Sequence, residues 1–291
     1  DRPREDAVSP DASPLDVPVV SAKIHGEVVL LLGWGSAILL QFAHPLVARG
    51  VADHSGFRQG LLAPWRRLHR TLHAMVTLTF GGPDEVATTA RAINAVHDRV
   101  HGTLVEAEGS FPAGTRYTAH DPALLGWVHA TCLYAFLRAY ELYVAPLRDD
   151  EKDRYCAESS AVAPLLGIPD GVLPRSQAEL DAYLARRLAS GEIVVTATAR
   201  RLAGELLAPP GVRHLWPLTW LLRVTALGLL PQSVREAYGF RWTARHRRAL
   251  GVLGWLVRHG RPLVPPALRR WPAARASRRR GPARAFARPV L

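Results

Sequence analysis

The apolar residues of this chain recur at intervals of three and four, which is the spacing of helices that bury one face. No stretch alternates at a period of two, as a half-buried strand would, and no glycine-rich phosphate loop follows a candidate strand. Proline-containing segments such as GIPDGVLP and LAPPG separate several of the helical patterns. The pattern therefore predicts an all-α protein with a single large multi-helix domain.

The most apolar segment covers residues 28–48. It is long enough to cross a bilayer, for which about 20 residues are needed. However, it contains Gln41 and His44, it ends at Pro45, and no basic segment or small-residue cleavage site precedes it. These features favour a buried core helix. The glycine-rich residues 48–65 that follow are expected to form a loop-like connection.

Two helices are expected on either side of the segment GGP. Residues 66–80 form the first, and the second begins at Asp84 and Glu85, whose charges suit the first turn of a helix. The second helix is expected to end at Gly102. Further helices are predicted at 122–144, 149–163, 176–189, 192–207, 217–229 and 243–260.

The net charge of +12 is concentrated at the end of the chain, because residues 269–291 contain eight arginines and no acidic residue. We expect a flexible arm at 1–20, the helical domain at 21–268 and a solvated basic tail at 269–291, which can touch a membrane surface weakly. No nucleic-acid-binding motif is found, so no specific nucleic acid partner is expected. Two cysteines without a Cys-x-x-Cys pair indicate a reduced, cytoplasmic protein.

The segment AINAVHDRVHG places His97 and His101 one helical turn apart. Such a pair can bind zinc, but Asp98 replaces the glutamate of zincin-type peptidases and no third ligand is evident. Haem needs only one histidine facing an apolar slot, and His97 lies on the apolar stripe. A core histidine bonded to a backbone carbonyl also fits, and spacing alone favours that reading.

Two further groups contain chemically useful side chains. In RRLHRTLH, Arg67 and Thr71 share a helix face, with Arg70 beside them, and such a face can bind a carboxylate, a propionate or an oxygen-derived ligand. A solvated basic surface fits the same pattern. His44-Pro45 and Asp53-His54 form another pairing, but its spacing matches no known metal motif.

Several segments, in order, resemble the rubber oxygenase (latex-clearing protein) and MpaB-type oxygenase catalytic-domain family. They cover roughly residues 24–270 and are LLLGWGSAILLQFAHPLVARGVADHS, RRLHRT, VTLTFGGPDE, INAVHDRVHG, YTAHDPALLGWVHAT, LLGIP and LLPQSVREAYGFRW. No single segment is decisive, but the ordered set is specific. The resemblance implies an all-helical fold with a globin-like core around a buried pocket for haem b.

The resemblance also implies roles for individual residues. His97 matches the proximal iron ligand in its His-x-x-Val context, with His101 as the fallback. Arg67 and Thr71 match an Arg-x-x-x-Thr pair close to the haem. Arg70 stands where rubber-cleaving members have a distal lysine, and an arginine stays protonated and does not ligate iron. Asp53 is the nearest counterpart of the distal acid.

The expected function is that of a haem b-dependent oxygenase that uses dioxygen on a small apolar substrate, such as an isoprenoid or lipid-like chain. Arg67, Arg70 and Thr71 are its expected catalytic residues. Two alternatives remain: a non-catalytic haem-binding protein of the same fold, and a haem-free helical protein that docks on anionic surfaces through its basic tail.

Overall fold

The computed structural model describes residues 19–54, 63–208 and 215–280; within these ranges, the side chains of 63–68 and 278–280 are not described. Fourteen α-helices fall in the described residues, and the only strands there form a two-stranded antiparallel sheet of β1 (His101–Thr103) and β2 (Arg116–Thr118). The prediction of an all-α fold is therefore confirmed. The α-helices are α1 Val19–His25, α2 Leu31–Phe42, α3 Pro45–His54, α4 Ala63–Phe80, α5 Pro83–His97, α6 Pro122–Tyr143, α7 Asp149–Ser160, α8 Gln177–Ala189, α9 Ala197–Leu207, α10 Trp216–Gly228, α11 Gln232–Ala237, α12 Ala244–Gly260, α13 Pro266–Arg269 and α14 Pro272–Arg280, with short 3-10 turns at Val28–Leu30, Pro164–Leu166 and Arg261–Leu263.

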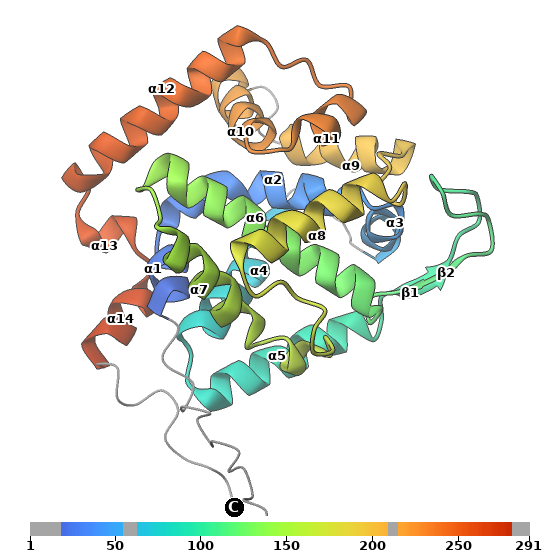
Figure 1. The fold of residues 1–291 in the computed structure, drawn as a ribbon, viewed down its shortest axis with the longest axis horizontal. Helices are drawn as coiled ribbons and strands as arrows, with labels where there is room; N and C mark the ends of the chain where they lie inside the picture. Colours follow the sequence, from blue (N-terminus) through green and yellow to red (C-terminus); the bar gives the residue numbers. More distant parts are fainter. Residues whose placement is uncertain (1–18, 55–62, 209–214, 281–291) are drawn as a thin grey trace, which may run out of the picture.

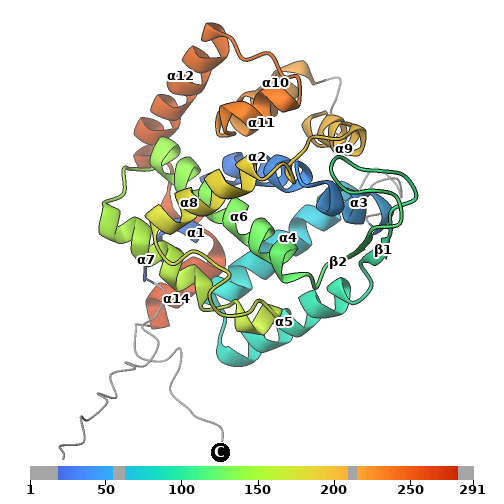
Figure 2. The same ribbon diagram turned by 45° about the vertical axis from the view of Figure 1, so that its right-hand side comes forward.

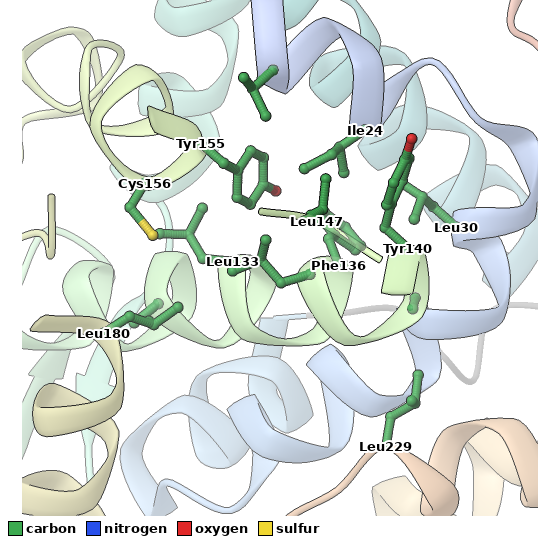
Figure 3. Packing of buried hydrophobic residues seen from close by; sticks show 14 of the residues in the cluster. Ile24, Leu30, Leu133, Phe136, Tyr140, Leu147, Tyr155, Cys156, Leu180 and Leu229 are labelled. Atoms are coloured by element: carbon green, nitrogen blue, oxygen red, sulfur yellow. The ribbon is translucent and has the colours of Figure 1, made fainter. Parts of the chain in front are cut away.

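Helix α6 forms the centre of the fold, with the other helices arranged around it (Figures 1 and 2). The side chain of Asp121 accepts a hydrogen bond from the backbone N–H of Ala123, which caps the helix at the point that the Asp-Pro pair predicts. Apolar residues surround nearly the whole helix, because α1, α2, α7, α8 and α12 all pack against it. Figure 3 shows Ile24 of α1 and Tyr155 of α7 over Leu133 and Phe136 of α6.

The predicted core segment 28–48 is one helix only as far as Phe42. A second helix, α3, begins at Pro45 and is bent by 106° from the first. Proline has no N–H to donate and its φ suits the first position of a helix, so it starts α3. The expectation of a loop from residue 48 was therefore wrong for 48–54, and residues 55–62 lie outside the described ranges. No single described helix is long and apolar enough to cross a membrane; this bent pair meets the length and composition criteria only when taken together.

Helix α5 begins as predicted, with the backbone N–H of Gly82 donating to the Glu85 carboxylate at 2.9 Å. It ends at His97 and not at Gly102, as the sequence had suggested. Beyond it the chain forms β1, where Gly102 pairs with Tyr117 of β2. A Cβ on Gly102 would lie 2.6 Å from the Tyr117 hydroxyl, so the tyrosine occupies the space that a side chain would need.

The chain after residue 268, expected to be a solvated tail, begins with ordered structure. Helix α14 packs against α4, and Ala274 on it is buried. Alanine-rich sequence favours the helix and gives it a small face that approaches α4 closely. Residues 281–291, the rest of the predicted tail, and 1–18, most of the predicted arm, lie outside the described ranges.

Candidate functional site

His97 is the last residue of α5 and lies half-buried near the start of α6. Its Nδ1 atom is buried and has no hydrogen-bond partner, and no hydrogen bond to its other ring nitrogen is found in the described residues. The only ring that contacts it there is His120, edge-on at 5.8 Å between centroids. Burial lowers the pKa of His97, the nearby His120 lowers it further, and Asp98 partly opposes both. The imidazole is therefore neutral at pH 7 and keeps a ring nitrogen available.

Neutrality and an uncommitted nitrogen are the two properties that an iron-binding imidazole needs. The alternative from the sequence was a core histidine that donates to a backbone carbonyl. No such hydrogen bond from His97 is found among the described residues. Its neighbour His120 is different, because His120 Nε2 lies 2.7 Å from the Asp98 carboxylate.

His101 lies in β1 and not on the helix that carries His97. Its side chain is exposed, and its backbone carbonyl accepts from a ring nitrogen of His54 at 3.0 Å. Since α5 ends at His97, the two histidines do not share a helix face. His101, the predicted fallback ligand, therefore lies on β1 and not one turn beyond His97 on the same helix, as predicted.

Helix α4 contains the predicted Arg-x-x-x-Thr pair. Arg67 is within α4, but its side chain lies outside the described residues. Arg70 and Thr71 are exposed on the same helix. Helices α4 and α5 are joined through Gly81 and Gly82, pack against each other, and diverge away from that connection (Figure 2). In such a hairpin His97 lies toward the end of α4 that carries Arg67 and Thr71.

A second group of histidines, both half-buried, lies between α1, α4, α6 and α7, and no prediction from the sequence included it. His25 on α1 is held on both sides, with Nδ1 2.8 Å from the Thr79 hydroxyl and Nε2 2.8 Å from the Tyr155 hydroxyl. His129 on α6 has a buried Nε2 without a hydrogen-bond partner. Burial lowers the pKa of each histidine to about 4, and for His25 the proximity of His129 adds to the effect.

The profile of the family described as ER-bound oxygenase mpaB/B'/Rubber oxygenase, catalytic domain, matches residues 22–259. The chain belongs to this family. The match covers the helical hairpin of α4 and α5 and all of α6, and it supports an oxygenase role for the domain. No match was found among curated proteins or solved structures.

Asp53, the expected counterpart of the distal acid in rubber oxygenases, is bound by other side chains of α3 and β2. Its carboxylate accepts from Tyr117 at 2.6 Å and from Arg49 at 2.9 Å. Although burial raises the pKa of Asp53, these two hydrogen bonds hold it below its ordinary value. Asp53 is therefore ionised and fixed in place, and it connects α3 to the sheet.

The pairing of His44 with His54 does not form a metal site in the described structure. His44 is buried, stacks on Phe111 and has an Nδ1 atom without a partner, while His54 binds the carbonyl of His101. Burial, with a contribution from the charge of Arg187, lowers the pKa of His44 to about 4. Among the described residues no group of three or more His, Cys, Asp and Glu side chains has the geometry to hold a metal ion. Cys132 and Cys156 are both free thiols.

Two polar clefts occur on the described surface. One, of about 270 Å³, is lined by Arg49, Leu104, Val105, Glu106 and Glu108. The other, of about 250 Å³, lies between α6, α7 and α8 and includes Lys152 and Asp181. Neither borders His97, and neither has the apolar lining that a hydrophobic substrate requires.

Sequence signals existed for some of the missed residues. His129 lies in the segment GWVHAT, which supports the family resemblance, and on α6 it is one turn before Leu133 and two before Phe136. This spacing already places His129 on a face that points into the core. No comparable signal marks His25, because its partners Thr79 and Tyr155 are more than 50 residues away in the chain.

Proposed function

We propose that this protein is a haem b-dependent oxygenase that uses dioxygen to oxidise a small apolar substrate, of the isoprenoid or lipid-like class. The observation that carries the proposal is the state of His97, a neutral imidazole with a buried and uncommitted ring nitrogen, within an oxygenase catalytic domain. Haem iron needs one such ligand and a surrounding that excludes water.

The buried, unpartnered Nδ1 atom of His97 is the observation that supports a place for the cofactor. His97 would hold the iron, and Arg67 and Thr71 of α4 would contact the porphyrin, with the guanidinium suited to a propionate. Arg70, which is exposed on the same helix, has no lone pair to donate to a metal and would not ligate the iron. When bound, the haem supplies the activation of dioxygen, which side chains alone do not provide.

The chain's own residues would set the conditions for that chemistry. His129 offers a neutral, buried nitrogen that can donate or accept one hydrogen bond inside the core. The apolar residues that pack around α6 would keep water away from a cofactor bound in the interior. Arg67, Arg70 and Thr71 would bind and orient polar groups at the α4 edge of the site.

The ligand assignment predicts that His97→Ala yields a folded protein with less than about a tenth of the wild-type haem content, because removal of the iron ligand removes the strongest bond to the cofactor. His101→Ala is the matched control, since that histidine is exposed on β1, and it should keep its haem. Haem content is measured by the pyridine haemochrome assay, and helicity by circular dichroism. Full haem retention by His97→Ala would contradict the assignment.

Oxygen consumption with a polyisoprenoid such as squalene tests the catalytic half of the proposal. Turnover by the haem-loaded wild type, absent in haem-free protein, is the expected result. A protein that binds haem stoichiometrically but consumes no oxygen with isoprenoid or fatty acyl substrates would instead be a non-catalytic haem protein of this fold.

A further inference from the structure

Helix α12 has two apolar faces, and only one of them is covered. The inner face contains Leu253, Gly254 and Val257, which pack on the core around α6. The contact is close, because a Cβ on Gly254 would lie 2.6 Å from a side-chain carbon of Leu142. Figures 1 and 2 show α12 along one edge of the molecule with no other labelled helix outside it.

The outer face consists of exposed residues spaced three and four apart. They are Arg245, Arg248, Val252, Trp255, Leu256 and His259. The three apolar members are 58%, 60% and 54% exposed, which is unusual for such large side chains at adjacent helical positions. The chain directly after the helix also exposes large apolar side chains, with Leu263 and Leu268 exposed by 86% and 70%.

Exposed apolar side chains are concentrated in this part of the molecule. Of the fifteen large hydrophobic residues exposed in the described ranges, ten lie between Leu215 and Leu268, on α10, on α12 and in the segment after it. They include all three exposed tryptophans of the described ranges, Trp216, Trp220 and Trp255. Helix α10 packs against α12, so the two helices belong to the same end of the fold.

The charged residues in this part of the chain are all basic. Residues 237–291 contain fourteen arginines and no Asp or Glu. Arg245 and Arg248 lie at the N-terminal end of α12, whose first turn has no acidic residue, and neither forms an ion pair with any described residue. A helix N-terminus already carries partial positive charge, so arginines there are unfavourable without an external anion.

Hydrogen bonds also fix the core-facing side of α12 and the residue that follows the helix. The Arg261 guanidinium forms two hydrogen bonds, of 2.8 and 2.6 Å, with the buried carboxylate of Glu27, and Arg258 donates to the backbone carbonyl of Glu141. The outer face therefore belongs to a helix that is anchored to the core. Its apolar side chains project outward, and neither cleft described above lies on it.

We propose that the outer face of α12, with Leu263 and Leu268, binds the surface of an anionic lipid bilayer. Tryptophan and leucine would enter the headgroup boundary while Arg245 and Arg248 contact lipid phosphates, which is the arrangement of interfacial amphipathic helices. A second copy of the chain fits poorly, because the surface offers no carboxylate to its arginines. Nucleic acid does not account for the exposed Val252, Leu256 and Leu263. This surface differs from the terminal basic residues 281–291 and does not depend on haem binding.

Vesicle flotation with the full chain tests the proposal. Binding to phosphatidylcholine vesicles that contain the anionic lipid phosphatidylserine should exceed binding to pure phosphatidylcholine and weaken in high salt. The variant Arg245→Gln/Arg248→Gln should lower the partition coefficient about 30-fold, since each arginine near the surface contributes about 1 kcal/mol. The variant Val252→Ser/Trp255→Ser/Leu256→Ser should lower it by at least about tenfold.

Matched controls separate this surface from general charge and hydrophobicity. Arg116→Gln/Arg201→Gln removes two exposed arginines elsewhere, and Val105→Ser/Leu165→Ser removes two exposed apolar residues elsewhere; both should bind like the wild type. Circular dichroism and thermal unfolding confirm that each variant folds. Wild-type binding by both α12 variants, or binding lost only on deletion of 281–291, would overturn the proposal. So would a dimer that dissociates in the triple serine variant, or binding to duplex DNA in preference to the vesicles.

Discussion

At the scale of single residues, three half-buried histidines combine a lowered pKa with ring nitrogens that lie inside the fold. His25 is held between two hydroxyl groups, His129 has a buried nitrogen without a partner, and His97 has one at the end of α5. All three have a lowered pKa, mainly through burial. The neutral imidazole is the form that binds metal, and acid converts it to the imidazolium cation, which does not.

A pH dependence of stability follows from His25 and His129. Their pKa is about 4 in the folded chain and about 6.5 when unfolded, so below pH 6.5 the unfolded state binds more protons. The stability that depends on their neutral form is complete above pH 6.5 and is lost as the pH falls toward 4, by on the order of 3 kcal/mol for each histidine. Urea unfolding at pH 7, 5.5 and 4.5 measures this loss.

The variant His129→Gln should reduce that loss, because glutamine does not titrate. His73→Gln, at an exposed position on α4, is the matched control and should leave the loss unchanged. A free energy of unfolding that stays constant between pH 7 and 4.5 would contradict the assignment of neutral buried histidines.

Some candidate site residues could be chosen from the sequence, and others only from the structure. The resemblance selects His97, whose Nδ1 atom is buried without a hydrogen-bond partner and whose pKa is lowered; its role as an iron ligand stays a prediction. Asp53 could not be judged from sequence, because its partner Tyr117 is 64 residues away. His25 was missed for the same reason, since burial and long-range hydrogen bonds leave no local pattern.

At the scale of elements, helix boundaries marked by capping groups and proline were predicted closely, whereas the end of α5 was not. Asp121-Pro122 and the Gly81-Gly82-Pro83 segment mark starts through capping groups and proline, which are local effects. The end of α5 depends on pairing between β1 and β2, a contact made across a loop. Pro45 marks the break between α2 and α3 in the sequence, but the angle of the bend depends on how both helices pack in the core.

Close packing between α2 and α6 predicts the effect of a single methyl group. A Cβ on Gly33 would lie 2.6 Å from the Ala139 Cβ and 3.1 Å from the Ala135 carbonyl oxygen. We expect Gly33→Ala to lower the free energy of unfolding by about 1–3 kcal/mol, because the two helices must move apart. Gly204→Ala on α9 is the control; its Cβ would meet no atom within 4 Å, so it should raise stability by roughly 0.5–1 kcal/mol. Equal effects of the two substitutions in urea unfolding would show that α2 and α6 are not in close contact.

At the scale of the whole molecule, the chain is closed by contacts between its N-terminal and C-terminal segments. Glu27, which is 1% exposed, binds Arg261 and Arg270 at 2.6 and 3.2 Å, and the backbone N–H of Trp271 donates to the carbonyl of Gly26. The segment after α12 is therefore part of the fold up to α14. Composition alone placed residues 269–280 in the tail, because they are rich in arginine, and the sequence contained no signal for Glu27 as the buried partner of Arg270.

Removal of the Glu27 charge should lower the free energy of unfolding. Glu27→Gln leaves two partly buried arginines without their anion, and we expect a loss of about 3 kcal/mol in the free energy of unfolding. Glu141→Gln, which breaks only a partly exposed pair with Lys152, should cost less than about 1 kcal/mol. Chemical denaturation compares the two variants. A loss at Glu27 no larger than that at Glu141 would mean that the two ends are not held together by this carboxylate.

The central claim is that this oxygenase-family domain binds haem through His97. Its most direct test is the absorption spectrum of the full chain, expressed with a haem precursor and purified, followed by a pyridine haemochrome assay. The account predicts a Soret band and about one haem b per chain. Protein that is folded by circular dichroism but contains no haem under these conditions would contradict the claim, and His97 would then be a core histidine.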